Sequence, residues 1–283
     1  MKIAISQITT LPAELELDLP AFARAGFTAT ELSLEKVNRF VAKKSIAALR
    51  EMLVRLGLKA VGAIGLAPSG PALLLSRGSE FQAYFKSLKK QLALCRALDI
   101  DQIGLGADAS KWALEDKWQA GAVKNVRLAA QLADDFSMRI GLEFMNLDAP
   151  IGPFVLDSLA STQQITEAVA HPAIGINLDF FHHYRSGGSV RELSKLDGQQ
   201  IVNVHVTDVA EGQIQDLADS DRILPGEGVL PLEDYREVIL ATGYEGYWTL
   251  ELLNKDLWLR DARDTAQLGA DAMARFAALR KVL

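Results

Sequence analysis

Four short apolar segments of the chain each end in a side chain that can bind a metal ion. The residues that end them are Glu143, Asp179, His205 and Glu251. A carboxylate buried at the end of an apolar strand without a partner is energetically costly. Any one of these side chains could equally cap a helix or pair with an arginine, but all four share the same position in their segments. A divalent cation bound by all of them would offset their charge, so the sequence predicts a shared metal site.

The types of these four side chains narrow the choice of metal. Three carboxylates and one imidazole suit Mn²⁺, Co²⁺, Mg²⁺ or Zn²⁺. Because the set contains no thiolate, it does not resemble the usual structural zinc site. We therefore expect one divalent metal ion at a site that performs chemistry.

Two further polar residues follow the candidate metal ligands along the chain. His182 follows Asp179 in an Asp-x-x-His spacing and could contact a substrate or a metal ligand, although it could also bond a backbone carbonyl in a loop. For His183 we expect that second, structural role. Arg222 lies in a segment with Gly226 and could hold a substrate hydroxyl or carbonyl oxygen. The alternative for Arg222 is a salt bridge that fixes its loop.

The chain alternates between short β-branched runs and longer segments with helical periodicity. The candidate strands are residues 2–8, 29–34, 59–65, 102–106, 139–145, 174–179, 201–206 and 247–253. The candidate helices are residues 18–26, 45–57, 80–98, 116–136, 161–171, 189–196, 231–242 and 261–281. Eight alternating units predict an α/β fold, a single (β/α)8 TIM barrel over residues 1–283, with an open doubly wound sheet as the alternative.

Local signals support these boundaries. Gly26, Gly57 and Gly243 stand where helices should end, and 161–164 resembles a capped helix start. His171, before Pro172, is expected to cap a helix C-terminus. The long segments 66–79, 146–160 and 207–230 follow the third, fifth and seventh candidate strands. In a barrel they would lie at the C-terminal face, where active sites are built.

Composition excludes several classes of protein. The 283 residues carry a net charge of −6 and no run of Lys or Arg, so we expect no binding to nucleic acid. The single cysteine, Cys95, lies on an apolar helix face and is expected to be an inert core thiol. Neither a signal peptide nor a run of about 18 apolar residues is found, so we expect a cytoplasmic protein without a membrane segment.

Several motifs in a fixed order make a family resemblance specific. They are Glu143-Phe144, Leu178-Asp179-x-x-His182, His205-Val206-x-Asp208, Asp221-Arg222-x-x-Pro225-Gly226-x-Gly228 and Glu251-Leu252. This order resembles the xylose isomerase-like TIM barrel superfamily, in its sugar isomerase and epimerase branch. The resemblance extends furthest to the 2-keto-myo-inositol (inosose) isomerases, where it includes Asp197-Gly198 and Leu217 ahead of Asp221.

The resemblance implies a metal-dependent isomerase or epimerase of a small keto-sugar or keto-polyol. It implies that Glu143, Asp179, His205 and Glu251 are the ligands of one divalent ion, foremost Mn²⁺. By the same resemblance Glu143 and Glu251 would also transfer protons through an enediolate, and His182 and Arg222 would contact substrate oxygens. Glu31 matches an acid of the family only weakly. A homodimer or homotetramer is a further expectation from the resemblance.

Three other functions remain open at this point. A 3-dehydroshikimate dehydratase-like lyase would use the same metal site, and Glu251-x-x-Asn254 resembles a pattern in such relatives. A non-catalytic sugar-binding barrel would not need both glutamates. A DNA-repair nuclease of the endonuclease IV type would need more than the four histidines of this chain. The segment 146–153 gives no recognisable substrate signature.

Overall fold

The computed structural model describes residues 1–65, 74–106, 118–147 and 154–279, and within them eight parallel strands form a closed barrel. The strands are β1 (Lys2–Ser6), β2 (Ala29–Ser33), β3 (Lys59–Ile64), β4 (Gln102–Gly106), β5 (Arg139–Glu143), β6 (Ile174–Asp179), β7 (Ile201–Val206) and β10 (Tyr247–Leu250). Their order is β1-β10-β7-β6-β5-β4-β3-β2. Because β1 pairs in parallel with β10, the sheet has no open edge, which confirms the barrel and excludes the doubly wound alternative.

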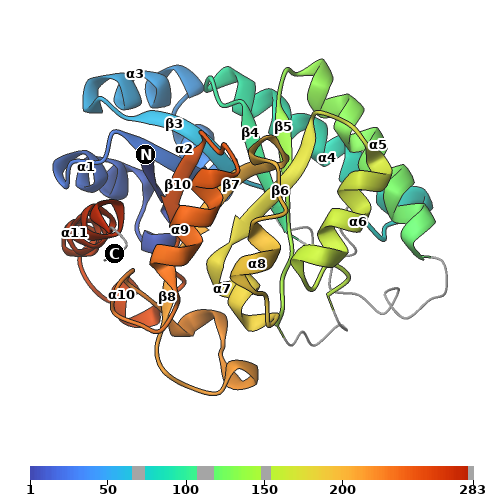
Figure 1. Cartoon of the computed structure of the whole chain (residues 1–283). Helices are drawn as coiled ribbons and strands as arrows, with labels where there is room; N and C mark the ends of the chain where they lie inside the picture. The colour runs from blue at the N-terminus through green and yellow to red at the C-terminus, as the bar shows by residue number, and fades with distance from the viewer. Residues whose placement is uncertain (66–73, 107–117, 148–153, 280–283) are drawn as a thin grey trace.

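Helices surround the barrel on its outside (Figure 1). The longer ones are α1 (Leu15–Arg24), α2 (Leu34–Lys43), α3 (Ile46–Leu56), α4 (Gly78–Ala97), α5 (Trp118–Asp135), α6 (Leu159–Val169), α9 (Leu232–Ala241) and α11 (Ala262–Ala278). Their buried apolar residues join most of those of the strands in a large hydrophobic core, and Ala4, Ala29 and Val61 of the strands form a separate small cluster. No helix in the described part of the chain combines the length and the apolar character needed to span a membrane.

The segments that follow the strands carry additional short elements. α7 (Phe180–Arg185), α8 (Val190–Leu193) and α10 (Lys255–Trp258) are short helices, and η1 (Gln7–Thr10), η3 (Gly198–Gln200), η4 (Ile214–Asp216) and η5 (Asp219–Asp221) are single 3-10 turns. β8 (Asp208–Val209) and β9 (Arg222–Ile223) form a small antiparallel pair. In Figure 1, α7, β8 and α10 lie toward the bottom of the view, at the C-terminal ends of the barrel strands.

The expected helix boundaries are partly confirmed. Gly26, Gly57 and Gly243 have φ values of +95°, +65° and +83°, a left-handed conformation that glycine adopts easily at helix ends. The expected helix start at 161–164 is wrong. The N-cap of α6 is Ser158, whose hydroxyl accepts from the Ser161 amide in a capping box.

Two other local expectations are also corrected by the structure. α6 ends at Val169 with Ala170 as its C-cap, so His171 does not cap the helix. The His171 Nδ1 atom instead accepts from the amide of Ala173. Strand β10 ends at Leu250, which leaves Glu251 one residue beyond the strand. Its amide still donates to Val206 and so continues the pairing with β7.

Candidate metal centre

The backbone places the four predicted metal ligands at one end of the barrel. Glu143 and Asp179 are the last residues of β5 and β6. His205 in β7 is in register with Asp179 on one side and with Thr249 of β10 on the other. Because the C-terminal ends of parallel strands meet at one edge, these side chains converge although they are far apart in the sequence.

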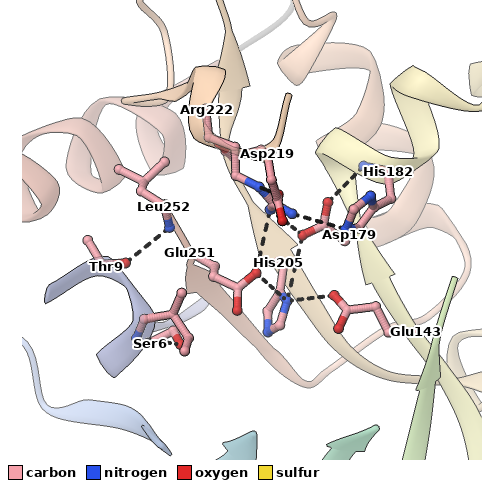
Figure 2. Close-up of polar contacts among 12 residues, drawn as sticks. Ser6, Thr9, Glu143, Asp179, His182, His205, Asp219, Arg222, Glu251 and Leu252 are labelled. Carbon is pink, nitrogen blue, oxygen red and sulfur yellow. Dashed lines mark hydrogen bonds and ion pairs between the residues drawn. The ribbon is translucent and has the colours of Figure 1, made fainter. Parts of the chain in front are cut away.

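The four side chains form one buried cluster (Figure 2). His205 Nδ1 lies 3.1 Å from Glu143 Oε1, 3.1 Å from Glu251 Oε2 and 3.7 Å from Asp179 Oδ2. One ligand atom from each residue can be chosen so that all lie within 4.8 Å of one another. The structure therefore brings together all four residues that the sequence singled out, and this buried donor set fits a divalent cation.

Electrostatics show that this cluster attracts positive charge. Burial raises the pKa of Glu143 to about 7, although His205 opposes the shift. Burial also raises the pKa of Glu251. Burial alone would lower the pKa of His205, but the neighbouring Glu251 and Glu31 raise it well above its usual value. Without a metal, Glu143, Glu251 and His205 therefore favour holding a proton between them. A divalent cation bound at the same point would take the place of that proton.

Arg222 lies beside Asp179 (Figure 2) and contacts the same carboxylate oxygen, Oδ2, that faces His205 Nδ1. Its side chain is buried, and its Nη1 atom donates to Asp179 Oδ2 at 2.5 Å. Its Nε atom donates to Asp219 Oδ1 at 2.6 Å, and its guanidinium lies over the Phe181 ring at 4.7 Å. Burial would raise the pKa of Asp179, but Arg222 lowers it to about 2. Arg222 therefore forms the loop-fixing salt bridges that were its alternative role, and it does so beside the metal cluster.

His182 is a residue of α7, and its side chain lies next to that of Arg222. Its amide donates to Asp179 Oδ1 at 2.9 Å, so Asp179 is also the N-cap of α7. Its Nε2 atom lies 3.2 Å from Arg222 Nη2, and burial lowers the pKa of the ring to about 4. Because a neutral ring accepts from arginine at Nε2, the proton is assigned to Nδ1, which has no partner among the described residues.

His183 has the structural role that the sequence predicts for it, with different partners. It lies in helix α7 rather than in a loop. Its Nδ1 atom pairs with the Tyr235 hydroxyl at 2.9 Å, not with a backbone carbonyl. His183 is fully buried, and the neighbours of its ring nitrogens, Tyr235 and Glu192, are not members of the cluster.

One aspartate organises the loop that carries Arg222. The carboxylate of Asp208 accepts from the amides of Val209, Gly226, Gly228 and Leu230 at 2.9–3.0 Å. A side chain at Gly228 would collide with this carboxylate, which explains the glycine. In the sequence Asp208 stands out only as part of a motif, and the signal for its function is the later Gly226-x-Gly228.

The comparisons with known proteins agree with the barrel fold. Residues 19–276 match the family model described as xylose isomerase-like TIM barrel. The chain belongs to this family. The xylose isomerase-like chain is 21% identical over 269 residues to an inosose isomerase of Bacillus velezensis, covering 94% of this chain and 93% of that protein. It is 26% identical over 270 residues to a 3-dehydroshikimate dehydratase of Pseudomonas putida, covering 94% of this chain and 39% of that protein.

Solved structures share the fold over the whole length. The crystal structure of the IolI protein, described as binding a zinc atom, superposes with a TM-score of 0.89 at 20% identity and covers 100% of both chains. A D-psicose 3-epimerase of Enterocloster bolteae is a further relative, 24% identical over 238 residues, covering 80% of this chain and 72% of that protein. The relatives are named as enzymes, among them isomerases and epimerases, which confirms the expectation of an enzyme of this type. The family resemblance drawn from the motifs is therefore confirmed.

Proposed function

We propose that this chain is a divalent-metal-dependent isomerase or epimerase of a small keto-sugar or keto-polyol of the inosose type. The observation that carries the proposal is the buried convergence of Glu143, Asp179, His205 and Glu251 at the barrel mouth. The likeness to inosose isomerases over 94% of the chain supports the substrate class.

In this proposal the two glutamates exchange protons with a substrate held between them. Glu143 arises from β5 and Glu251 follows β10, and their carboxylates approach His205 Nδ1 from two sides (Figure 2). In the proposed reaction one carboxylate removes the proton next to the substrate carbonyl. The electron pair of the broken C–H bond forms the enediolate of the substrate, and the other carboxylate returns a proton to the neighbouring carbon or to the opposite face.

A bound cation would supply Lewis acidity that stabilises negative charge on the substrate oxygens. Asp179 and His205 would hold it together with the two glutamates. Arg222 and His182 would contact substrate oxygens from the side of Asp179 and exclude water there. Mn²⁺ is our first choice from the oxygen-rich ligand set, and Zn²⁺ is the alternative that the IolI structure favours.

A dehydratase remains the second candidate, because the Pseudomonas putida relative matches 94% of this chain. The Glu251-x-x-Asn254 pattern gives it little additional support. The Asn254 amide donates to the carbonyl of Arg222 at 2.8 Å, and its oxygen caps α10. These bonds explain Asn254 as a structural residue.

Metal analysis and proton exchange test the proposal. We expect about one divalent ion per chain, and with added Mn²⁺ the protein should incorporate deuterium from D₂O into inosose next to its carbonyl. Glu143→Gln and Glu251→Gln should each lower this exchange by at least about 10²-fold. Glu167→Gln, on an exposed face of α6, is the matched control and should be unaffected. Absence of metal, or full exchange in both site variants, would overturn the proposal, whereas formation of protocatechuate from 3-dehydroshikimate would favour the dehydratase.

A further inference from the structure

The ring of His205 has a second partner inside the barrel, on the side away from the cluster. Its Nε2 atom lies 3.0 Å from Glu31 Oε2 and 3.3 Å from Glu31 Oε1. Glu31 is in the middle of β2 and is 2% exposed. Neither lysine nor arginine pairs with it among the residues that the structure describes. A carboxylate buried in this way is costly unless a strong donor compensates it, and the imidazole N–H is such a donor.

The position of Glu31 is fixed by a chain of hydrogen bonds across the barrel. The Asn203 side-chain amide donates to Glu31 Oε1 at 3.0 Å. The Thr249 hydroxyl donates to Asn203 Oδ1 at 3.0 Å, which sets the orientation of the asparagine. These residues are all nearly inaccessible to solvent, so water does not compete for the bonds. This series of hydrogen bonds runs from Thr249 of β10 through Asn203 of β7 to Glu31 of β2, and ends at His205.

The arrangement determines which ring nitrogen faces the cluster. If Nε2 carries the hydrogen that Glu31 accepts, the lone pair of the neutral ring lies on Nδ1. Nδ1 is the atom that lies 3.1 Å from both Glu143 and Glu251. Metal-binding histidines commonly donate their other N–H to a carboxylate, which orients the ring and increases its affinity for the metal.

We propose that Glu31 is a positioning residue, which accepts the Nε2–H of His205 and thereby directs Nδ1 toward a divalent cation held by Glu143, Asp179 and Glu251. The inference rests on the proposed metal site and adds to it a residue that does not touch the metal. Asn203 and Thr249 support Glu31 in this role.

The experiment uses Zn²⁺ as the probe, because it is diamagnetic. In the zinc-loaded wild-type protein, long-range ¹H–¹⁵N spectra of labelled histidines should show His205 with a proton on Nε2 and zinc on Nδ1. The Glu31→Gln variant should bind Zn²⁺ about 10- to 100-fold more weakly, because the amide loses the negative charge. Thr30→Val is the matched control, since Thr30 is an equally buried neighbour in β2 whose hydroxyl donates to Ile5. It should bind Zn²⁺ like the wild type.

The possible outcomes separate the role of Glu31 from the existence of the metal site. Zinc on Nε2 of His205 in the wild type, or an unchanged Zn²⁺ affinity of Glu31→Gln, would overturn the role of Glu31 alone. Failure of the wild type to bind Zn²⁺ at all would overturn the metal site and the inference with it. If Glu31→Gln does not fold, Thr249→Val tests the same chain. A several-fold loss of affinity in that variant supports the proposal, and wild-type affinity contradicts it.

Discussion

Arg222 shows how a single buried side chain can serve both the loop and the site. Its guanidinium joins Asp179 of the cluster to Asp219 of the following loop and stacks on Phe181. The planar fork and the delocalised charge of arginine suit these three contacts at once, whereas lysine offers one compact charge. Arg222 therefore compensates part of the negative charge of the cluster before any metal binds.

We expect Arg222→Met to destabilise the metal-free protein by about 3–5 kcal/mol, because it leaves Asp179 and Asp219 without a buried counter-charge. Urea unfolding in EDTA measures the effect. The control is Arg263→Met, which removes an exposed ion pair with Asp261 and should leave the stability nearly unchanged. Added Mn²⁺ should stabilise Arg222→Met more than the wild type. Equal stability of the two variants in EDTA would contradict the central role of Arg222.

For single residues, the sequence identifies some members of the site better than others. Glu143, Asp179, His205 and Glu251 stand out because each ends an apolar run. Glu31 stands in the middle of a strand, and both faces of a parallel barrel strand are buried. Alternation therefore does not reveal whether Glu31 points into the barrel or toward the helices, and only the closed structure shows that it meets His205.

Among the elements, the segment after β7 determines where Arg222 lies. β9 begins with Arg222 and pairs with β8. The Asp208 carboxylate at the start of β8 accepts hydrogen bonds from the amides of Gly226 and Gly228, in the turn that follows β9. Charge-assisted hydrogen bonds of this kind are stronger than neutral ones. The loop is thus held by one side chain on the neighbouring strand.

We expect Asp208→Asn to loosen this loop and to cost roughly 3 kcal/mol of stability. Asparagine has one acceptor oxygen instead of two, and its NH₂ group would face amide donors. Hydrogen exchange at the amides of Gly226 and Gly228 should accelerate strongly while the barrel strands remain protected. Asp221→Asn is the control, because Asp221 accepts from the single amide of Ala218 at the surface. Unchanged protection of both glycines would rule out this role for Asp208.

The strand–helix alternation predicted all eight barrel strands, but the short elements of the mouth were not predicted. α7 begins directly after Asp179 and α2 directly after Ser33, so no turn signal separates strand from helix. The pair β8 and β9 has two residues in each strand, too few for a periodic pattern. These elements are fixed by contacts across the mouth, such as the Asn254 bond to Arg222, which a linear sequence does not reveal.

For the molecule as a whole, a second buried ion pair connects the first two strand–helix units at a distance from the metal cluster. Lys36 of α2 donates to Asp18 of α1 at 2.5 Å and to the carbonyl of Thr10 at 2.8 Å. Gln7 of η1 donates to the same aspartate at 2.9 Å and accepts from the Ser33 amide. Because both charges are buried, their desolvation opposes the Coulomb attraction of the pair.

This pair should give the stability of the protein a characteristic dependence on pH. Burial raises the pKa of Asp18 from 3.8 to about 6, although Lys36 opposes the shift. Between about pH 4 and 6 the folded chain therefore retains a proton that the unfolded chain has released, and the contribution of Asp18 to stability falls as the pH rises. A shift of about two units corresponds to roughly 3 kcal/mol.

The double variant Asp18→Asn/Lys36→Met removes the titrating pair and is the reference for the measurement. The free energy of unfolding of the double variant minus that of the wild type should increase by roughly 3 kcal/mol from pH 4 to pH 7. Urea unfolding of both proteins in EDTA at several pH values measures this difference. The contributions of the metal-cluster residues to the pH dependence cancel, because both proteins contain these residues. A difference that stays flat, or that decreases over this range, would mean that Asp18 remains ionised in the fold and that attraction to Lys36 outweighs its burial.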